Sequence, residues 1–227
     1  ARTITPRPYP DHADLTVVRN ATGALEPIES PDAWARRRGD ILAGMQTVMG
    51  RLPEADELGP LAVEERGRET LEGCTRTLLT YAAGPGQRVT AHLYLPDAGS
   101  GAHLADAGRR PAVLALHPTS NLGKLVVAGD GPKANRGYAV ELARRGYVVL
   151  APDYPSFGDL ADYDFHTDAH ASGTMAAIVN HLRGVDLLVA RPDVDPERIG
   201  AIGHSLGGHN AIFVGVFDPR IKAVVSS

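Results

Sequence analysis

The sequence predicts an α/β protein, with a mostly parallel sheet that has an antiparallel N-terminal edge and helices on both faces. Short, nearly continuous apolar runs occur at 112–116, 147–151, 199–203 and 221–225. Such runs are typical of parallel strands that are covered on both sides. Helical patterns separate them, so we expect right-handed crossover connections within one sheet.

The segment before Pro111 predicts the antiparallel edge. Residues 71–81 and 88–95 alternate in polarity on either side of Gly84-Pro85-Gly86. Alternation on both sides of a glycine-rich turn is the pattern of a β-hairpin. We therefore expect these two strands to pair before the parallel part of the sheet begins.

An N-terminal extension precedes this hairpin. Residues 1–31 are polar and proline-rich, which predicts an extended arm. A helix is expected over 33–49, because Ser30 or Asp32 can cap it and Gly50 can end it. Its apolar residues recur near helical spacing and are Trp34, Ile41, Leu42, Met45 and Val48. We predict that residues 1–67 form an arm and helix that pack on a core of residues 68–227.

Three further helices are expected between or after the parallel strands. The first covers 135–145 and ends in two arginines followed by Gly146, a cationic last turn with a glycine stop. The second covers 172–190, where apolar residues recur at three- and four-residue spacing. The third begins at Ser205 and runs to about residue 216.

Charge and composition exclude several classes of function. The 227 residues carry 23 basic and 27 acidic side chains, a formal charge of -4, which would not gather a phosphate backbone. We therefore expect no nucleic-acid partner. No apolar run approaches the roughly 18 residues that a membrane-spanning helix needs, so no membrane partner is expected either. The single cysteine, Cys74, cannot form an internal disulfide and leaves the cellular location open.

The strongest chemical signal is Gly203-His204-Ser205-Leu206-Gly207, a G-x-S-x-G between an apolar run and a helical pattern. A nucleophile on a strand-to-helix turn needs an unusual backbone angle, and the turn closes only if the residues two before and two after it are small. Gly203 and Gly207 meet that need as elbow glycines. Ser205 is therefore the predicted catalytic nucleophile. The alternative is a serine that only caps a helix.

A tetrahedral oxyanion needs two hydrogen-bond donors. We expect the first to be the backbone N–H of Leu206, directly after the nucleophile. The second is expected where the strand at 112–116 runs into the polar segment His117-Pro118-Thr119. Because Pro118 has no N–H, Thr119 is the predicted second donor of the oxyanion hole. The alternative is an ordinary turn in which His117 is held by local hydrogen bonds.

These segments together resemble the α/β-hydrolase family over about residues 70–227. The segments 116–119, 151–158 and 203–208 look most like its dienelactone-hydrolase and acetyl-xylan-esterase branch. The resemblance implies an α/β-hydrolase fold and a serine carboxylesterase that forms an acyl-enzyme on Ser205. It also implies that no cofactor and no metal are needed, and that the substrate is a small-molecule or carbohydrate-linked ester.

A base and an acid are expected after the nucleophile, because the family's order along the chain is Ser, Asp or Glu, then His. After Ser205 the only histidine is His209 and the only acid is Asp218. If the helix starts at Ser205, the His209 side chain turns into the packing around that helix and not over the hydroxyl. Asp218 is expected to be a turn residue. His204 points away from Ser205 by the geometry of the turn.

The histidines before the nucleophile give no better base. The loop 159–171 contains His166, His170 and four aspartates, but their spacing matches no zinc or calcium template, so we expect a solvated capping loop. His181 falls within a predicted helix and is expected to be structural.

We therefore expect the chain shown to stop after the sixth strand of the family's sheet. The acid and the histidine would then lie beyond Ser227, in a second fragment or in a partner chain, and an oligomer is left open. Two alternatives remain for function. One is a peptidase or C–C bond hydrolase of the same fold, and the other is a non-catalytic α/β-hydrolase scaffold.

Overall fold

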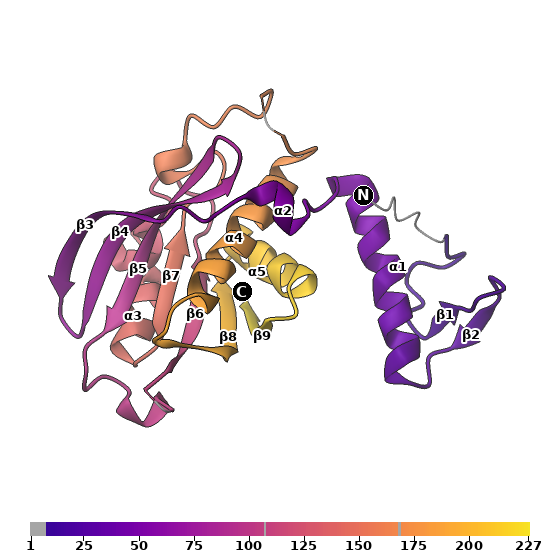
Figure 1. Ribbon diagram of the computed structural model, residues 1–227, viewed down its shortest axis with the longest axis horizontal. Coiled ribbons are helices and arrows are strands. Elements are labelled where there is room, and N and C mark those ends of the chain that lie inside the picture. The colour runs from indigo at the N-terminus through magenta and orange to yellow at the C-terminus, as the bar shows by residue number, and fades with distance from the viewer. Residues whose placement is uncertain (1–7, 107, 168) are drawn as a thin grey trace. The chain divides into compact units, whose positions relative to one another are not determined.

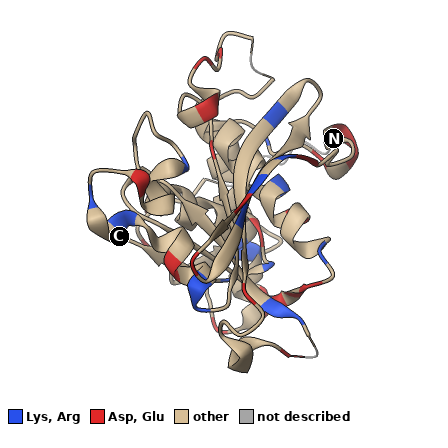
Figure 2. Cartoon of the chain, turned by 90° about the vertical axis from the view of Figure 1, so that its left-hand side faces the viewer, with Lys and Arg blue, Asp and Glu red and all other residues tan. Residues whose placement is uncertain are grey.

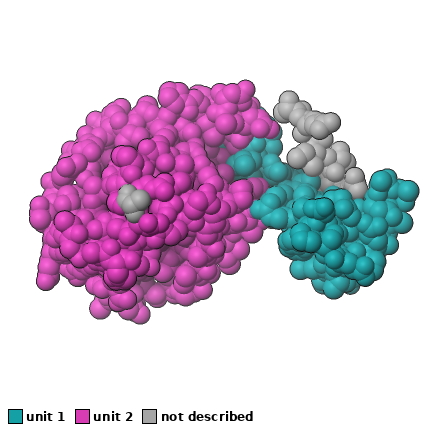
Figure 3. All heavy atoms as spheres, turned by 60° about the horizontal axis from the view of Figure 1, so that its bottom comes forward, with its two compact units in different colours: residues 1–52, 170–175 teal, residues 53–169, 176–227 magenta. Residues whose placement is uncertain are grey.

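The structure, a computed structural model, describes residues 8–106, 108–167 and 169–227. The chain divides into two compact units (Figure 3). The smaller unit comprises Ala1–Leu52 with His170–Met175, and the larger comprises Pro53–Ala169 with Ala176–Ser227. The predicted packing of residues 1–67 on the core stays a prediction.

The larger unit is built on one sheet that has seven strands in the described part of the chain (Figure 1). In spatial order, the first three strands form an antiparallel meander, and the third pairs antiparallel with the fourth. The remaining pairs of neighbouring strands are parallel. This arrangement confirms the predicted fold class. In spatial order the strands are β3 (Glu64–Leu71), β4 (Cys74–Gly84), β5 (Gln87–Pro96), β7 (Val148–Pro152), β6 (Arg110–Leu116), β8 (Val194–Gly203) and β9 (Ile221–Ser226).

Helices cover both faces of the sheet because successive strand residues point to opposite sides. One buried cluster joins β6 and β7 to α4 (Gly173–Val189) and α5 (Leu206–Phe217). The other joins the alternate residues of the same strands to α3 (Tyr138–Arg144). Shorter helical pieces are α2 (Ala55–Leu58) and the turns Ala102–Leu104, Val126–Asp130, Ala134–Arg136 and Gly158–Leu160.

The sheet reverses its strand order around β6. From β6 the chain crosses to β7 on one side and then to β8 on the other. Loops that leave the carboxyl ends of β6 and β8 therefore diverge, and open α/β sheets hold their ligands at such a switch point. The parallel register pairs Leu116 with Gly203, so both strands end at the same level.

The smaller unit contains α1 (Pro31–Met49) and a short hairpin of β1 (Val17–Arg19) and β2 (Leu25–Pro27). The helix confirms the prediction, and its N-cap is Ser30, whose hydroxyl accepts from the N–H of Ala33. The predicted extended arm is wrong over 17–27, because these residues pair as strands. Residues 1–7 of that arm lie outside the described residues.

The face that α1 buries also differs from the expected one. Ala33, Arg37 and Ala43 are its buried residues, whereas Trp34 and Val48 are exposed. Small side chains allow close packing, and the Arg37 guanidinium lies 3.5 Å from the centre of the Tyr9 ring. Stacking on an aromatic face is a common way to bury part of an arginine.

One strand of the sheet was not predicted from the sequence. β3 pairs with β4, yet every residue of β3 except Leu71 is exposed. Its side chains therefore carry no alternation between buried and exposed positions, which is the signal that identifies a strand from sequence. The hairpin of β4 and β5 is confirmed, with Gly84 and Gly86 at positive φ in its turn.

The described surface carries acidic and basic residues in mixture. In the cartoon of Figure 2, segments coloured for Lys and Arg are interspersed with segments coloured for Asp and Glu. None of the helices in the described ranges is long and apolar enough to cross a membrane.

The centre of the sheet sets the stability of the larger unit. Leu150 on β7 is fully buried in the cluster with α4. Replacing it by alanine removes buried methyl groups and leaves a cavity, so we expect Leu150→Ala to lower the free energy of unfolding by about 2–5 kcal/mol. Urea titration measures this. Val63→Ala, at a 46% exposed position, is the control and should change it by less than about 0.5 kcal/mol.

Candidate active site

Ser205 lies in a sharp turn between β8, which ends at Gly203, and α5, which begins at Leu206. Its backbone has φ 54° and ψ -120°, a conformation that L-residues rarely adopt. Ser156 and Ala62 are the other described non-glycine residues at positive φ. The Ser205 side chain is exposed, and its hydroxyl forms no hydrogen bond with any described residue. The turn therefore presents a free hydroxyl at the carboxyl edge of the sheet.

The two flanking glycines allow this turn to close. A Cβ on Gly203 would overlap the backbone of Gly207 and lie 2.6 Å from the nitrogen of Gly208. A Cβ on Gly207 would overlap the carbonyl of Leu116 and lie 2.7 Å from the carbonyl oxygen of His117. No side chain fits at either position. The first turn of α5 thus packs directly on the backbone where β6 ends.

That contact brings the loop after β6 beside the Ser205 turn. The loop runs from His117 to Leu125, and the predicted donor Thr119 is an exposed residue within it. Neither the N–H of Thr119 nor that of Leu206 is used in a hydrogen bond to a described residue. Leu206 is also the first residue of the twelve-residue helix α5, where the helix dipole presents partial positive charge.

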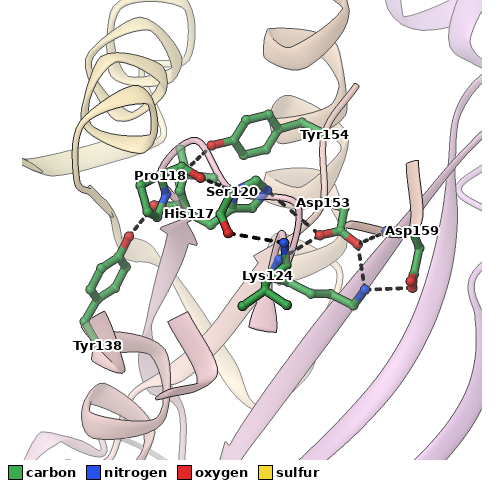
Figure 4. Close-up of polar contacts among 10 residues, drawn as sticks. His117, Pro118, Ser120, Lys124, Tyr138, Asp153, Tyr154 and Asp159 are labelled. Carbon is green, nitrogen blue, oxygen red and sulfur yellow. Dashed lines mark hydrogen bonds and ion pairs between the residues drawn. The ribbon is translucent and has the colours of Figure 1, made fainter. Parts of the chain in front are cut away.

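Two tyrosines hold the beginning of this loop (Figure 4). The hydroxyl of Tyr138 donates to the carbonyl of Leu116, and that of Tyr154 donates to the carbonyl of His117. The His117 ring stacks on the Tyr154 ring with centroids 4.0 Å apart and planes 9° apart. Burial raises the pKa of both tyrosines, that of Tyr138 to about 12, so both stay protonated donors.

His117 is a buried structural histidine. Its Nδ1 lies 2.8 Å from the carbonyl oxygen of Pro118, which can only accept, so Nδ1 carries the proton. Burial lowers its pKa to about 4, so the ring is neutral at pH 7. Its Nε2 has no hydrogen-bond partner, and the 3.9 Å contact with Oδ1 of Asp153 is therefore not an ion pair.

The remaining histidines near the elbow contact residues other than Ser205. Nδ1 of His204 lies 3.0 Å from the hydroxyl of Ser227, as the geometry of the turn predicts. His209 stacks against Phe213, with ring centroids 4.3 Å apart. The expected burial of His209 in the packing around α5 is wrong, because its side chain is exposed.

His181 is fully buried on α4, which agrees with the expected structural role. Its Nε2 lies 3.2 Å from Oδ1 of Asn210, an atom that can only accept, so this nitrogen carries the proton. Burial lowers the pKa of His181 to about 3.

The acidic residues considered from sequence have local partners. Asp218 ends α5 and accepts from both the backbone N–H and the guanidinium of Arg220, as a turn residue does. In the loop 159–171, Asp164 accepts from the N–H of His166. Asp168 lies outside the described residues. Among the residues that the structure describes, no group of three His, Cys, Asp or Glu side chains could hold a metal ion.

One cluster of charged residues was not predicted from the sequence. The carboxylate of Asp153, directly after β7, binds the ammonium of Lys124 at 2.6 Å, and Lys124 also binds Asp159 at 2.7 Å (Figure 4). Asp153 is fully buried and Lys124 is 3% exposed. One feature of the sequence could have indicated this cluster. It is an acid at the carboxyl end of a buried strand, followed five residues later by Gly158.

Comparison with known proteins agrees with this geometry. Residues 125–227 match the model of the alpha/beta hydrolase family. The sheet order, the helices on both faces and the serine turn after β8 belong to the same architecture. The protein has the α/β-hydrolase fold. The resemblance predicted from the sequence is thereby confirmed.

Individual proteins are similar to this chain. It is 31% identical over 189 residues to “Putative hydrolase YtaP” of Bacillus subtilis strain 168, which covers 78% of the chain and 60% of the relative. The glucuronoyl esterase from Solibacter usitatus superimposes with a TM-score of 0.64 and 21% identity, over 89% of this chain and 60% of that one. Acetyl xylan esterase 1 from Thermoanaerobacterium sp. JW/SL YS485 gives 0.54 and 17%, over 73% and 52%. The chain thus spans between half and two thirds of each.

Packing at the elbow predicts a strong dependence on Gly207. Because a Cβ there would overlap the backbone of β6, we expect Gly207→Ala to lower the free energy of unfolding by about 3 kcal/mol or more. Gly39→Ala is the matched control. Gly39 lies within α1 with nothing within 4 Å of an added Cβ, so alanine should stabilise by up to about 1 kcal/mol. Equal effects of both substitutions would contradict the packing argument.

The buried histidines predict a loss of stability in mild acid. The pKa of His117 is lowered to about 4 and that of His181 to about 3, so the unfolded chain binds more protons than the folded one below about pH 6.5. Stability should therefore be full above that pH and fall as pH drops, by up to about 1.4 kcal/mol per pH unit for each histidine. Denaturation between pH 6.5 and 5 measures the slope. His181→Gln should make it shallower, and a pH-independent wild type would contradict the prediction.

Proposed function

We propose that this protein is a serine carboxylesterase in which Ser205 attacks the ester carbonyl. The observation that carries the proposal is the turn of Ser205 itself. Its hydroxyl is exposed and unbonded within the described chain, at φ 54°, between a strand end and a helix start, with glycines two residues to either side. A backbone of this kind has a cost and recurs where a nucleophile must stand clear of the sheet.

The N–H groups of Leu206 and Thr119 are the proposed oxyanion donors. When the Ser205 oxygen bonds to the carbonyl carbon, the C=O electron pair moves to oxygen and negative charge develops there. Two unpaired backbone N–H groups in neighbouring segments can stabilise that charge, and the first turn of α5 adds its dipole. Collapse of the tetrahedral species expels the alcohol and leaves an acyl-enzyme. Water then releases the acid.

The proton on Ser205 needs a base, normally a histidine that a carboxylate orients. His204 and His209 contact Ser227 and Phe213, and His117 and His181 are buried. We therefore propose that the base and the acid come from outside these 227 residues, either from a longer chain or from a partner chain. The other histidines of the chain are His12, His92, His103, His166 and His170. Of these, His166 and His170 lie in the loop between β7 and α4, and an experiment can eliminate them.

The proposed substrates are esters of small acyl groups or esters attached to carbohydrate. This choice draws on the printed activities of the structural neighbours, an acetyl xylan esterase and a glucuronoyl esterase. Their identity to this chain is low, so the esters to be compared should include acetylated sugars, uronic acid esters and simple aryl acetates.

Covalent labelling and a serine substitution test the proposal, and these and the later kinetic variants are measured in the longest natural chain that contains residues 1–227. A fluorophosphonate should add to Ser205, as mass spectrometry of the digested protein would reveal. Ser205→Ala should reduce aryl acetate turnover by at least about a thousandfold. Thr119→Ala is the control, because the proposed contribution of this residue is its backbone N–H and not its side chain. Full turnover by an unlabelled protein would refute the proposal.

The same assay separates the alternatives. Preference for amide over ester substrates would indicate a peptidase. Absence of turnover in the longest natural chain that contains residues 1–227 would indicate a non-catalytic scaffold. If the 227-residue chain turns over by itself and loses activity on His166→Ala or His170→Ala, then the base lies within the chain.

A further inference from the structure

Asp153 joins two loops at the carboxyl edge of the sheet (Figure 4). Its own N–H donates to the carbonyl of Thr90 on β5 at 2.8 Å, which fixes its backbone to the sheet. Its carboxylate accepts from the backbone N–H of Lys124 at 2.7 Å and from that of Asp159 at 3.0 Å. Lys124 belongs to the loop after β6, and Asp159 to the loop after β7.

Charge reinforces these backbone contacts. The Lys124 ammonium lies 2.6 Å from Oδ2 of Asp153 and 2.7 Å from Oδ2 of Asp159. Asp153 is fully buried and Lys124 is 3% exposed, whereas the Asp159 side chain is 57% exposed. A buried carboxylate that keeps a buried cation and two N–H donors is fully paired, and removal of one partner leaves an uncompensated charge. The Asp153 carboxylate is therefore the centre of the cluster, and the Asp159 side chain lies at its edge.

Two glycines let the loops close around the carboxylate. Gly123 has φ 53° and Gly158 has φ 56°, and an added Cβ on either residue would overlap the Asp153 carboxylate. A Cβ on Gly123 would also lie 2.7 Å from the Cα of Gly158. The two loops thus touch each other at their glycines, with no space for a side chain between them.

The predicted oxyanion donor lies between this cluster and the tyrosine anchors. Tyr138 and Tyr154 hold the carbonyls of Leu116 and His117 at the start of the loop, and Asp153 holds Lys124 at its end. Thr119 is exposed, and its N–H has no partner in the described chain. The peptide unit that carries this N–H also carries the Pro118 carbonyl, which accepts from Nδ1 of His117 at 2.8 Å. The direction of the N–H is therefore set by that bond together with the two ends of the loop.

We propose that Asp153 is a positioning residue that aims the N–H of Thr119 at the developing oxyanion, by clamping the loop after β6 to the loop after β7. This inference rests on the proposed esterase function. Oxyanion donors act on the transition state more than on the bound ester, so loss of the clamp should appear in kcat rather than in KM. A displacement of about 1 Å can cost on the order of a hundredfold in rate.

The test compares three aspartate variants by kinetics on an aryl acetate. Asp153→Asn removes the charge and should lower kcat about tenfold to a hundredfold while KM changes less than about threefold. Asp159→Asn keeps the backbone N–H that binds Asp153 and should change kcat less than about threefold. Asp195→Asn is the matched control at the opposite end of β8, where a buried carboxylate accepts from the N–H of Glu197 and the guanidinium of Arg198. It should lower the melting temperature without a change in kcat.

Hydrogen exchange tests the clamp without requiring activity. In Asp153→Asn the amides of residues 117–125 should exchange faster, whereas those of β8 should not. If Asp153→Asn fails to fold, the double variant Asp153→Asn with Lys124→Met removes both buried charges together, which folded proteins often tolerate. It should give the same changes in kcat and exchange.

Two results distinguish a failure of the positioning role of Asp153 from a failure of the proposed esterase function. Equal kcat values in Asp153→Asn and Asp195→Asn, with unchanged exchange over 117–125, would overturn the positioning role even in an active esterase. Absence of Ser205-dependent turnover in the longest natural chain that contains residues 1–227 would refute the esterase. The exchange measurement then still decides whether Asp153 holds the loop, and unchanged exchange rejects the clamp.

Discussion

The contact between the first turn of α5 and the end of β6 is the constraint on which the site depends. Gly207 meets the carbonyls of Leu116 and His117 with no room for a side chain. This contact aligns three features at once: the exposed hydroxyl of Ser205, the N-terminus of α5 and the loop that contains Thr119. The position of Ser205 relative to the end of β6 is therefore set by backbone packing.

Polar groups around that contact are arranged in two layers. Beneath the loop, neutral His117 and the hydroxyls of Tyr138 and Tyr154 satisfy or pack against the backbone. At the far end of the loop, Asp153 and Lys124 supply full charges. Neutral groups lie under the loop and the ion pair lies at its end. A buried charge strongly affects its surroundings unless it is paired, and Lys124 compensates the buried Asp153 carboxylate.

The sequence was informative where a local pattern carries the structure. The elbow at Ser205 could be predicted because the steric need for glycine repeats at fixed spacing. β6, β7 and β8 could be predicted because buried parallel strands are largely apolar runs. β9 has the same apolar pattern, but the expected cover on both faces is wrong, because its residues after Ile221 are exposed. The Asp153 cluster could not be predicted from the sequence, because it joins residues 29 positions apart that share no periodicity. β3 has exposed side chains without alternation. On α1, the large apolar residues suggested the wrong face, because Ala33 and Ala43 pack where Trp34 does not.

The backbone conformation of Ser205 also affects the stability of the fold. A residue in this region of φ and ψ costs on the order of 1–3 kcal/mol, and glycine would relieve most of that cost. The fold would therefore be more stable without its proposed nucleophile. The close contacts of Gly203 and Gly207 with the surrounding backbone offset this cost and hold the conformation in place.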